Sequence, residues 1–276
     1  MKKSHILLTV ISCFLVALNL NSCGESSDKT IKVCASELPH ANILNNVVKD
    51  LLSDEGYNLE VTILDWTIQN DAVKNGDYDA NYFQHIPYLI SSSTNTNQEE
   101  VFASCKVHYE PLRIYAGKAS VDYKDSKATF EICNDVSNAT RALDLLVDVG
   151  VLTSYEKDTD GNADLEKLPS NIVPIAENLL VNSLADYDYG LLPCNTAMTG
   201  NIDATSEKNK DLPSENSSLA DAKANVIAAS TTRYKNDTVY KAKIDVLTDA
   251  LLTNEVKEYI DSTRKGVVLT YQKDLR

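Results

Sequence analysis

The chain alternates between short apolar segments and segments with helical spacing, and this alternation restricts its fold more than any other feature. Strand-like runs at 31–35, at 59–64 and from 79 onward are each followed by a helical pattern, the clearest of which spans 43–52. Strands that alternate with helices in this way pair in parallel and are covered by those helices. The sequence therefore predicts an α/β fold.

A second series of the same kind begins at 128–134, and extended segments near 105–118 and near 220–228 separate the two series. Further strands are expected at 171–176, 189–195 and 224–229, and further helices at 179–185, 239–252 and 255–262. We infer two α/β lobes joined by two crossover strands that form a hinge. Lobe 1 comprises 31–113 plus 223–276, and lobe 2 comprises 114–222. Such a molecule has a cleft that closes around a ligand.

The N-terminus has the pattern of an export signal. Lys2 and Lys3 precede an apolar run at 6–18, which is shorter than the roughly 20 residues that a membrane-spanning helix needs. We therefore expect a signal peptide at 1–22. Ser22 followed by Cys23 resembles a bacterial lipobox, which predicts a lipidated Cys23, a polar tether at 23–30 and attachment to the extracytoplasmic face of the cell membrane. The alternative is an ordinary signal peptide with an incidental cysteine.

Composition and motifs exclude several classes of function. The net charge is −14 and the mature region has no basic cluster, so we expect no nucleic-acid partner. No nucleophile elbow, phosphate-binding loop or HExxH motif is present, so we expect no enzyme activity, no cofactor and no resident metal. The cysteines Cys34, Cys105, Cys133 and Cys194 match no CxxC pattern, and we expect free, buried thiols. If one pair forms, Cys133 with Cys194 is the candidate.

Candidate binding residues follow the predicted strands, where open α/β sheets bind their ligands. Aromatic candidates lie in the first lobe, and amide and guanidinium candidates lie mostly in the second. The set is Trp66, Tyr82, Phe83, His85, Asn134, Arg141, Asn195 and Asn225. The alternatives are a core role for the aromatic stretch 79–89, a solvated arginine and asparagines that merely form turns.

This combination suits a zwitterion with an apolar tail. The guanidinium of Arg141 is able to bind a carboxylate in a bidentate fork. The side-chain oxygens of Asn195 and Asn225 are able to accept hydrogen bonds from an ammonium group. The first-lobe rings would then enclose the tail.

Six segments in order resemble one known family. The stretch DANYFQHIPYL at 79–89 is close to the hallmark DANYFQHxPYL of the NlpA-type methionine-binding lipoproteins, the substrate-binding parts of ABC importers. Supporting segments lie at 38–41, 106–112, 134–143, 224–227 and 265–268. The chain departs from the family at Trp66, where tyrosine is usual, which makes amino-acid binding a firmer expectation than methionine in particular.

The resemblance implies a type-II periplasmic-binding-protein fold, a monomer without catalytic activity, free methionine as the ligand, and an ABC permease and ATPase as partners. It implies that Arg141 holds the carboxylate and that Asn195 and Asn225 hold the amino group. It also adds His108 and Glu110 to Tyr82, Phe83 and His85 in the side-chain pocket.

Two other classes of function stay open. Imidazole and carboxylate groups are suitable zinc ligands, so His85, His108 and Glu110 are candidates for a zinc-binding receptor, with His40 as a further ligand. The sequence is also compatible with a surface lipoprotein that works without a transporter.

Overall fold

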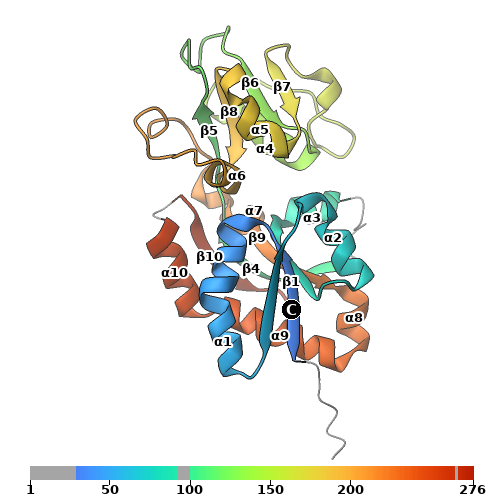
Figure 1. Ribbon diagram of the computed structural model, residues 1–276. Coiled ribbons are helices and arrows are strands. Elements are labelled where there is room, and N and C mark those ends of the chain that lie inside the picture. Colours follow the sequence, from blue (N-terminus) through green and yellow to red (C-terminus); the bar gives the residue numbers. More distant parts are fainter. Residues whose placement is uncertain (1–28, 93–99, 265–266) are drawn as a thin grey trace, which may run out of the picture.

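The computed structural model describes residues 29–92, 100–264 and 267–276. It contains two β-sheets, which lie one above the other in Figure 1. The predicted signal peptide and the lipidation site Cys23 lie outside the described residues. No helix in the described part of the chain has the length and apolarity needed to cross a membrane.

The larger sheet has the strand order β10-β4-β9-β3-β1-β2. Its strands are β1 (Thr30–Ala35), β2 (Asn58–Ile63), β3 (Ala80–His85), β4 (Val101–Tyr109), β9 (Ala224–Ser230) and β10 (Leu269–Asp274). The first three strands are parallel, as predicted. Because β9 is antiparallel to both β3 and β4, and β10 is antiparallel to β4, the sheet as a whole is mixed.

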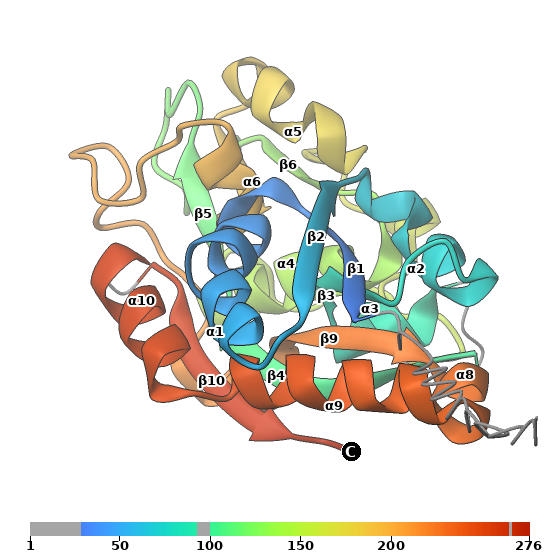
Figure 2. The same cartoon turned by 60° about the horizontal axis from the view of Figure 1, so that its bottom comes forward.

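Helices cover both faces of this sheet and form the first lobe with it. They are α1 (Lys49–Asp54), α2 (Trp66–Asn75), α3 (Ile86–Ser91), α8 (Thr231–Asn236), α9 (Thr238–Leu251) and α10 (Asn254–Arg264), with π-helical turns η1 (Glu37–Ala41) and η2 (Leu44–Val48) before α1. Figure 2 shows α9 lying along the sheet, where it packs against α1 and β4. Apolar side chains of β1, η2 and α9 share one buried core.

The second lobe is built on the smaller sheet, of order β5-β8-β6-β7. Its strands are β5 (Leu112–Ala116), β6 (Phe130–Cys133), β7 (Ile172–Ile175) and β8 (Tyr189–Pro193). Its helices are α4 (Val136–Asp148), α5 (Glu177–Ser183) and α6 (Cys194–Thr199), with short turns η4 (Leu165–Lys167), η5 (Leu184–Asp186) and η6 (Ser217–Leu219) before α7 (Ala220–Lys223). The lobe has its own core, which includes Phe130, Leu143 and Leu146.

The chain crosses between the sheets twice. It leaves the larger sheet after Tyr109 and joins the smaller sheet at Leu112, and it returns between Lys223 and Ala224. We propose these crossings as the lobe boundaries, close to the predicted positions 113/114 and 222/223.

Three local predictions differ from the structure. Cys194 and Asn195 begin helix α6, although the sequence predicts a strand that ends at 195. The C-terminal strand β10 was not predicted, because its pairing with β4 joins segments about 160 residues apart, beyond the reach of a local pattern. The polar composition of segment 201–222 indicates a surface connection, but the segment contains the buried residues Asn209 and Glu215.

The four described cysteines are free and buried, as expected. The Sγ atom of Cys194 lies 2.8 Å from the carbonyl oxygen of Pro111, and no bond to Cys133 forms. Burial raises the pKa of Cys34, Cys105 and Cys194 to about 12, so these thiols remain protonated at neutral pH.

Candidate ligand-binding cavity

A cavity of about 420 Å³ lies between the two lobes. First-lobe residues in its wall include Trp66, Phe83, His85, Tyr88 and Asn225, and second-lobe residues include Asn138, Arg141, Glu177, Asn195 and Thr196. Glu110, in the first crossing between the lobes, also lines it. The volume is within the range of small-molecule sites.

Strand register brings three of the predicted residues into one row. His85 of β3 pairs with Asn225 of β9, and Asn225 pairs with His108 of β4. These strands are adjacent although the residues are far apart in sequence. The sheet therefore places the wall residues His85 and Asn225 beside His108, which lies buried behind the wall.

His85 links the lobes through a defined tautomer. Its Nδ1 atom accepts a hydrogen bond from the backbone N–H of Tyr88 at 3.1 Å and thereby caps helix α3. The proton of the neutral ring is then on Nε2, which donates to Oδ1 of Asn138 in the second lobe at 3.2 Å. Burial, together with the charge of Arg141, lowers the pKa of His85 to about 4, so the ring is neutral at pH 7.

Arg141 is buried, and protein groups already hold most of its guanidinium. Nε donates to Oε1 of Glu215 at 2.9 Å, and Nη2 donates to Oε2 of Glu215 at 2.5 Å and to the carbonyl oxygen of Glu110 at 2.9 Å. Nη1 donates to Oδ1 of Asn138 at 3.3 Å. Within the described residues, four of the five N–H donors of this arginine are therefore engaged, and one on Nη1 has no protein acceptor.

Glu215 is the buried partner that fixes this arginine. Burial alone would raise the pKa of Glu215, but the charge and hydrogen bonds of Arg141 outweigh it and lower the pKa to about 2. The same carboxylate accepts hydrogen bonds from the Tyr109 hydroxyl at 2.9 Å, the Leu112 N–H at 2.8 Å and Nζ of Lys223 at 3.1 Å. It thus ties Arg141 to residues beside both crossings.

Aromatic rings form the apolar part of the wall, with Tyr88 at their centre. The ring centroid of Tyr88 lies 5.1 Å from that of Trp66, 5.7 Å from that of Phe83 and 6.4 Å from that of His85. All three contacts are edge-to-face, which is a favoured geometry for aromatic pairs. These rings offer a rigid apolar surface at one end of the cavity.

Glu177 adds a carboxyl group on the opposite side, in the second lobe. Thr196 donates a hydrogen bond from Oγ1 to Oε1 of Glu177 at 2.5 Å. Burial raises the pKa of Glu177, and the hydrogen bonds of Thr196 and of the Trp66 side chain act in the opposite direction. Trp66 of the first lobe therefore interacts with Glu177 of the second lobe.

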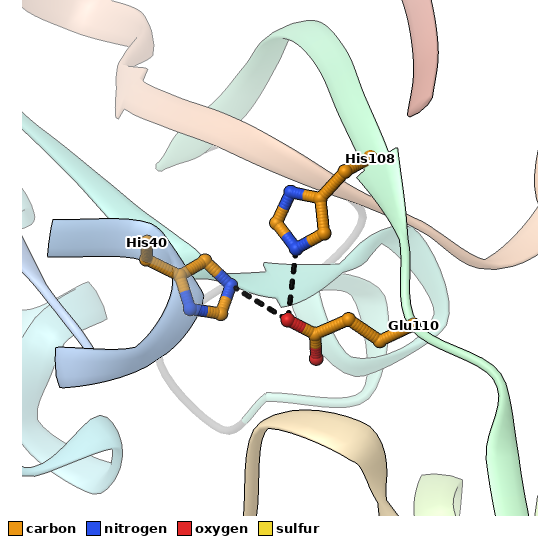
Figure 3. Close-up of side chains that lie close together, drawn as sticks. All are labelled: His40, His108 and Glu110. Carbon is orange, nitrogen blue, oxygen red and sulfur yellow. Dashed lines mark hydrogen bonds and ion pairs between the residues drawn. The ribbon is translucent and has the colours of Figure 1, made fainter. Parts of the chain in front are cut away.

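Glu110 belongs to a buried network behind the cavity wall (Figure 3). Its Oε1 atom lies 2.8 Å from Nε2 of His108 and 3.6 Å from Nε2 of His40. Nε2 of His40 is also 3.1 Å from Oδ1 of Asn225, and the Tyr82 hydroxyl hydrogen-bonds Nδ1 of His108. The network joins the wall residues Glu110 and Asn225 to the core of the first lobe.

The structure separates the predicted site residues into three groups. Seven line the cavity: Trp66, Phe83, His85, Glu110, Arg141, Asn195 and Asn225. Tyr82 and His108 are fully buried in the network behind it. Asn134 is exposed and is not part of the wall.

Sequence reasoning missed several residues that the structure brings to the site. Asn138 lies three residues before Arg141, so it shares a helical face with Arg141, and that spacing was a usable signal. Tyr88 lies within the aromatic stretch but was not singled out. Glu177, Thr196 and Glu215 carried no local signal, since their roles depend on contacts made across the fold.

Comparison with known proteins gives a consistent assignment. Residues 31–271 match the model of the NlpA lipoprotein family. The chain is 31% identical over 281 residues to the methionine-binding lipoprotein MetQ of Bacillus subtilis strain 168, and the match covers 98% of each protein.

Solved structures show the same architecture. A lipoprotein from Ruminococcus gnavus is similar with a TM-score of 0.76 and 35% identity, covering 88% of this chain and 99% of the other. A nutrient-binding protein from Burkholderia cenocepacia bound to methionine is similar with a TM-score of 0.72 and 27% identity, covering 87% and 99%. The predicted two-lobed α/β fold of the periplasmic-binding-protein type is confirmed.

Proposed function

Because the chain belongs to the NlpA lipoprotein family, we propose that it binds free methionine, or a closely related amino acid, in the interlobe cavity and delivers it to an ABC permease. The observation that carries the proposal is the buried Arg141 in the wall. Glu215 fixes its position, and one N–H on Nη1 has no acceptor in the described part of the chain. A buried cation with a spare donor is suited to a ligand carboxylate.

The remaining wall suits the other parts of an amino acid. Glu110 and Asn195 offer oxygen acceptors for an ammonium group, and Asn225 joins them although its Oδ1 already contacts His40. The rings of Trp66, Phe83 and Tyr88 surround the side chain of the ligand. A thioether contacts aromatic ring edges favourably, which supports methionine among apolar amino acids.

The wall offers binding groups from both lobes, and the chemistry is that of a binder without a reaction. The bound amino acid holds the lobes together, because Arg141 and the aromatic rings lie on opposite lobes. Loss of the ligand then permits the lobes to separate about the two crossings.

The location follows from the N-terminus. Cleavage before Cys23 and lipidation of that cysteine attach the protein to the extracytoplasmic face of the cell membrane, as a monomer beside its permease and ATPase. The polar tether predicted at 23–30 leads from the anchor into strand β1.

Mass spectrometry of the small molecule that is released when the purified protein is denatured tests this function. We expect methionine in a near-stoichiometric amount. A different class of molecule, such as a sugar or a nucleotide, would overturn the proposal. If the protein purifies empty, binding of isotope-labelled methionine to the same preparation decides the question.

A further inference from the structure

Three buried side chains in the first lobe and its first crossing place metal-binding atoms close together (Figure 3). His40 and His108 are fully buried and Glu110 is 3% exposed, and one ligand atom from each lies within 4.8 Å of the others. We propose that His40, His108 and Glu110 form a site for a divalent transition-metal ion of the zinc class, with Oδ1 of Asn225 as the fourth ligand.

The separations between these atoms fit a tetrahedral ion. With N and O ligands about 2.0–2.1 Å from a zinc ion, neighbouring ligand atoms of a tetrahedron are about 3.3 Å apart. The observed separations are 2.8 Å from His108 Nε2 to Glu110 Oε1, 3.6 Å from His40 Nε2 to Glu110 Oε1, and 3.1 Å from His40 Nε2 to Asn225 Oδ1. These three separations lie on both sides of this value, and the ligand atoms of His40, His108 and Glu110 all lie within 4.8 Å of one another. The side chains would therefore move towards a common centre when an ion binds.

The donor chemistry is also suitable. Two imidazoles, a carboxylate and an amide oxygen are borderline-to-hard ligands that favour Zn²⁺ or Co²⁺ over soft Cu⁺. A ligating histidine usually donates its second ring N–H to a neighbour that fixes its orientation. The Tyr82 hydroxyl lies at Nδ1 of His108 and is able to accept that proton.

The ligand set differs from the zinc ligands proposed from sequence. His85 is absent from the cluster, because its Nδ1 accepts from the Tyr88 backbone and its Nε2 contacts Asn138 of the second lobe. His40 takes its place, supplied by the turn η1.

A bound ion would replace the direct hydrogen-bond contact between Nε2 of His108 and Oε1 of Glu110. The four donors come from η1, from β4, from the first crossing and from β9. An ion there would connect the turn η1 to both chain segments that lead into the second lobe. The ion would also bind Glu110 and Asn225, which line the cavity. Metal binding can nevertheless be measured whichever amino acid the cavity binds.

Titration with Co²⁺ tests the site directly. The full chain without a polyhistidine tag is treated with a chelator, exchanged into metal-free buffer and titrated with CoCl₂. We expect the intense visible absorption of four-coordinate Co²⁺, saturating at about one equivalent and removed by one equivalent of Zn²⁺. A spectrum no stronger than that of aqueous Co²⁺ would overturn the proposal.

Two variants locate the site. His40→Gln should lose the Co²⁺ absorption, whereas His85→Gln should keep it, since His85 is the other histidine that lines this region and contributes no donor. Retention of the spectrum in His40→Gln, or its loss in His85→Gln with the fold intact by circular dichroism, would contradict the assignment.

A measurement on the unaltered chain covers the case in which His40→Gln does not fold. Zn²⁺ at 100 times its Kd should stabilise the folded protein and raise the Tm in a concentration-dependent way. A Tm that does not change up to millimolar Zn²⁺ would refute the site without any variant.

Discussion

Glu215 accepts two hydrogen bonds from Arg141, at 2.9 Å from Nε and 2.5 Å from Nη2, and both side chains are buried. The carboxylate lies in the long connection before the second crossing, and it also binds groups on either side of the first crossing. The pair therefore fixes the proposed carboxylate-binding residue and joins the segments about which the lobes would move.

Removing the charge of Glu215 should destabilise the fold. Glu215→Gln leaves Arg141 buried without its counter-ion, and breaking a buried pair in this way costs about 3–5 kcal/mol. Urea unfolding followed by circular dichroism measures the loss. Glu207→Gln is the matched control, because Glu207 lies in the same connection but pairs with Lys210 at the exposed surface. Equal stabilities of the two variants would contradict the structural role of Glu215.

Asn138 and Asn134 distinguish the structure from the sequence prediction. Asn138 accepts hydrogen bonds from Arg141 and His85, and its loss should weaken methionine binding by about 1–3 kcal/mol. Asn134 is exposed outside the wall, so Asn134→Ala should leave the affinity within a factor of about two. Calorimetric titration of both variants checks this. The reverse order of effects would restore the prediction made from sequence.

Trp66 should influence affinity more than stability. It is half-buried at the cavity, where its ring lies 5.1 Å from that of Tyr88. Trp66→Ala removes the ring from the cavity wall, and the loss of an aromatic contact with the ligand, worth about 0.5–1.5 kcal/mol, should lower the methionine affinity by up to roughly tenfold. The Tm without ligand should change little. An unchanged affinity would show that the indole ring does not contact the ligand.

Glu131 predicts a pH dependence of stability in the second lobe. Its side chain is buried, Ser183 donates to Oε2 at 2.5 Å, and Oε1 has no hydrogen-bond partner among the described residues. Burial raises its pKa from 4.5 to about 7. Because the folded state binds the proton of Glu131 more tightly than the unfolded state does, protonation of Glu131 adds to the free energy of unfolding. This stabilisation is complete below pH 4.5 and is lost as the pH rises through 7.

The variant Glu131→Gln removes this titration. The unfolding free energy of the wild type, measured relative to that of Glu131→Gln, should therefore fall between pH 5 and pH 8. Using the difference cancels the other titrating groups. A difference that is constant over this range would mean that Glu131 titrates normally in the folded protein.

The sequence predicted those parts of the fold that local patterns encode. The run 31–35, the stripe from Ile43 to Leu52 and the stretch 79–89 have clear periodicities, and the structure has strands or helices at each. The mixed pairing of the larger sheet and strand β10 depend on contacts between distant segments, which periodicity does not report.

The site shows the same division. Arg141 and His85 stood out because a cation and an aromatic cluster followed predicted strands, and both line the cavity. Glu215 did not stand out, because a glutamate in a polar segment looks solvated until the fold buries it against Arg141. Asn134 and Asn195 each follow an apolar segment and a cysteine, but only Asn195 of these two lines the cavity. Asn138, one helical turn after Asn134, lines the cavity in the second lobe.

Calorimetric titration of the ligand-stripped protein with L-methionine tests the central claim most directly. The protein is unfolded, dialysed and refolded to remove any bound ligand, and Arg141→Ala is titrated in parallel. We predict one site per chain with a Kd tighter than about 10 μM for the wild type, and a loss of about 2–5 kcal/mol for Arg141→Ala. Absence of methionine binding by the refolded wild type, or equal affinity in Arg141→Ala, would contradict the proposed binding site.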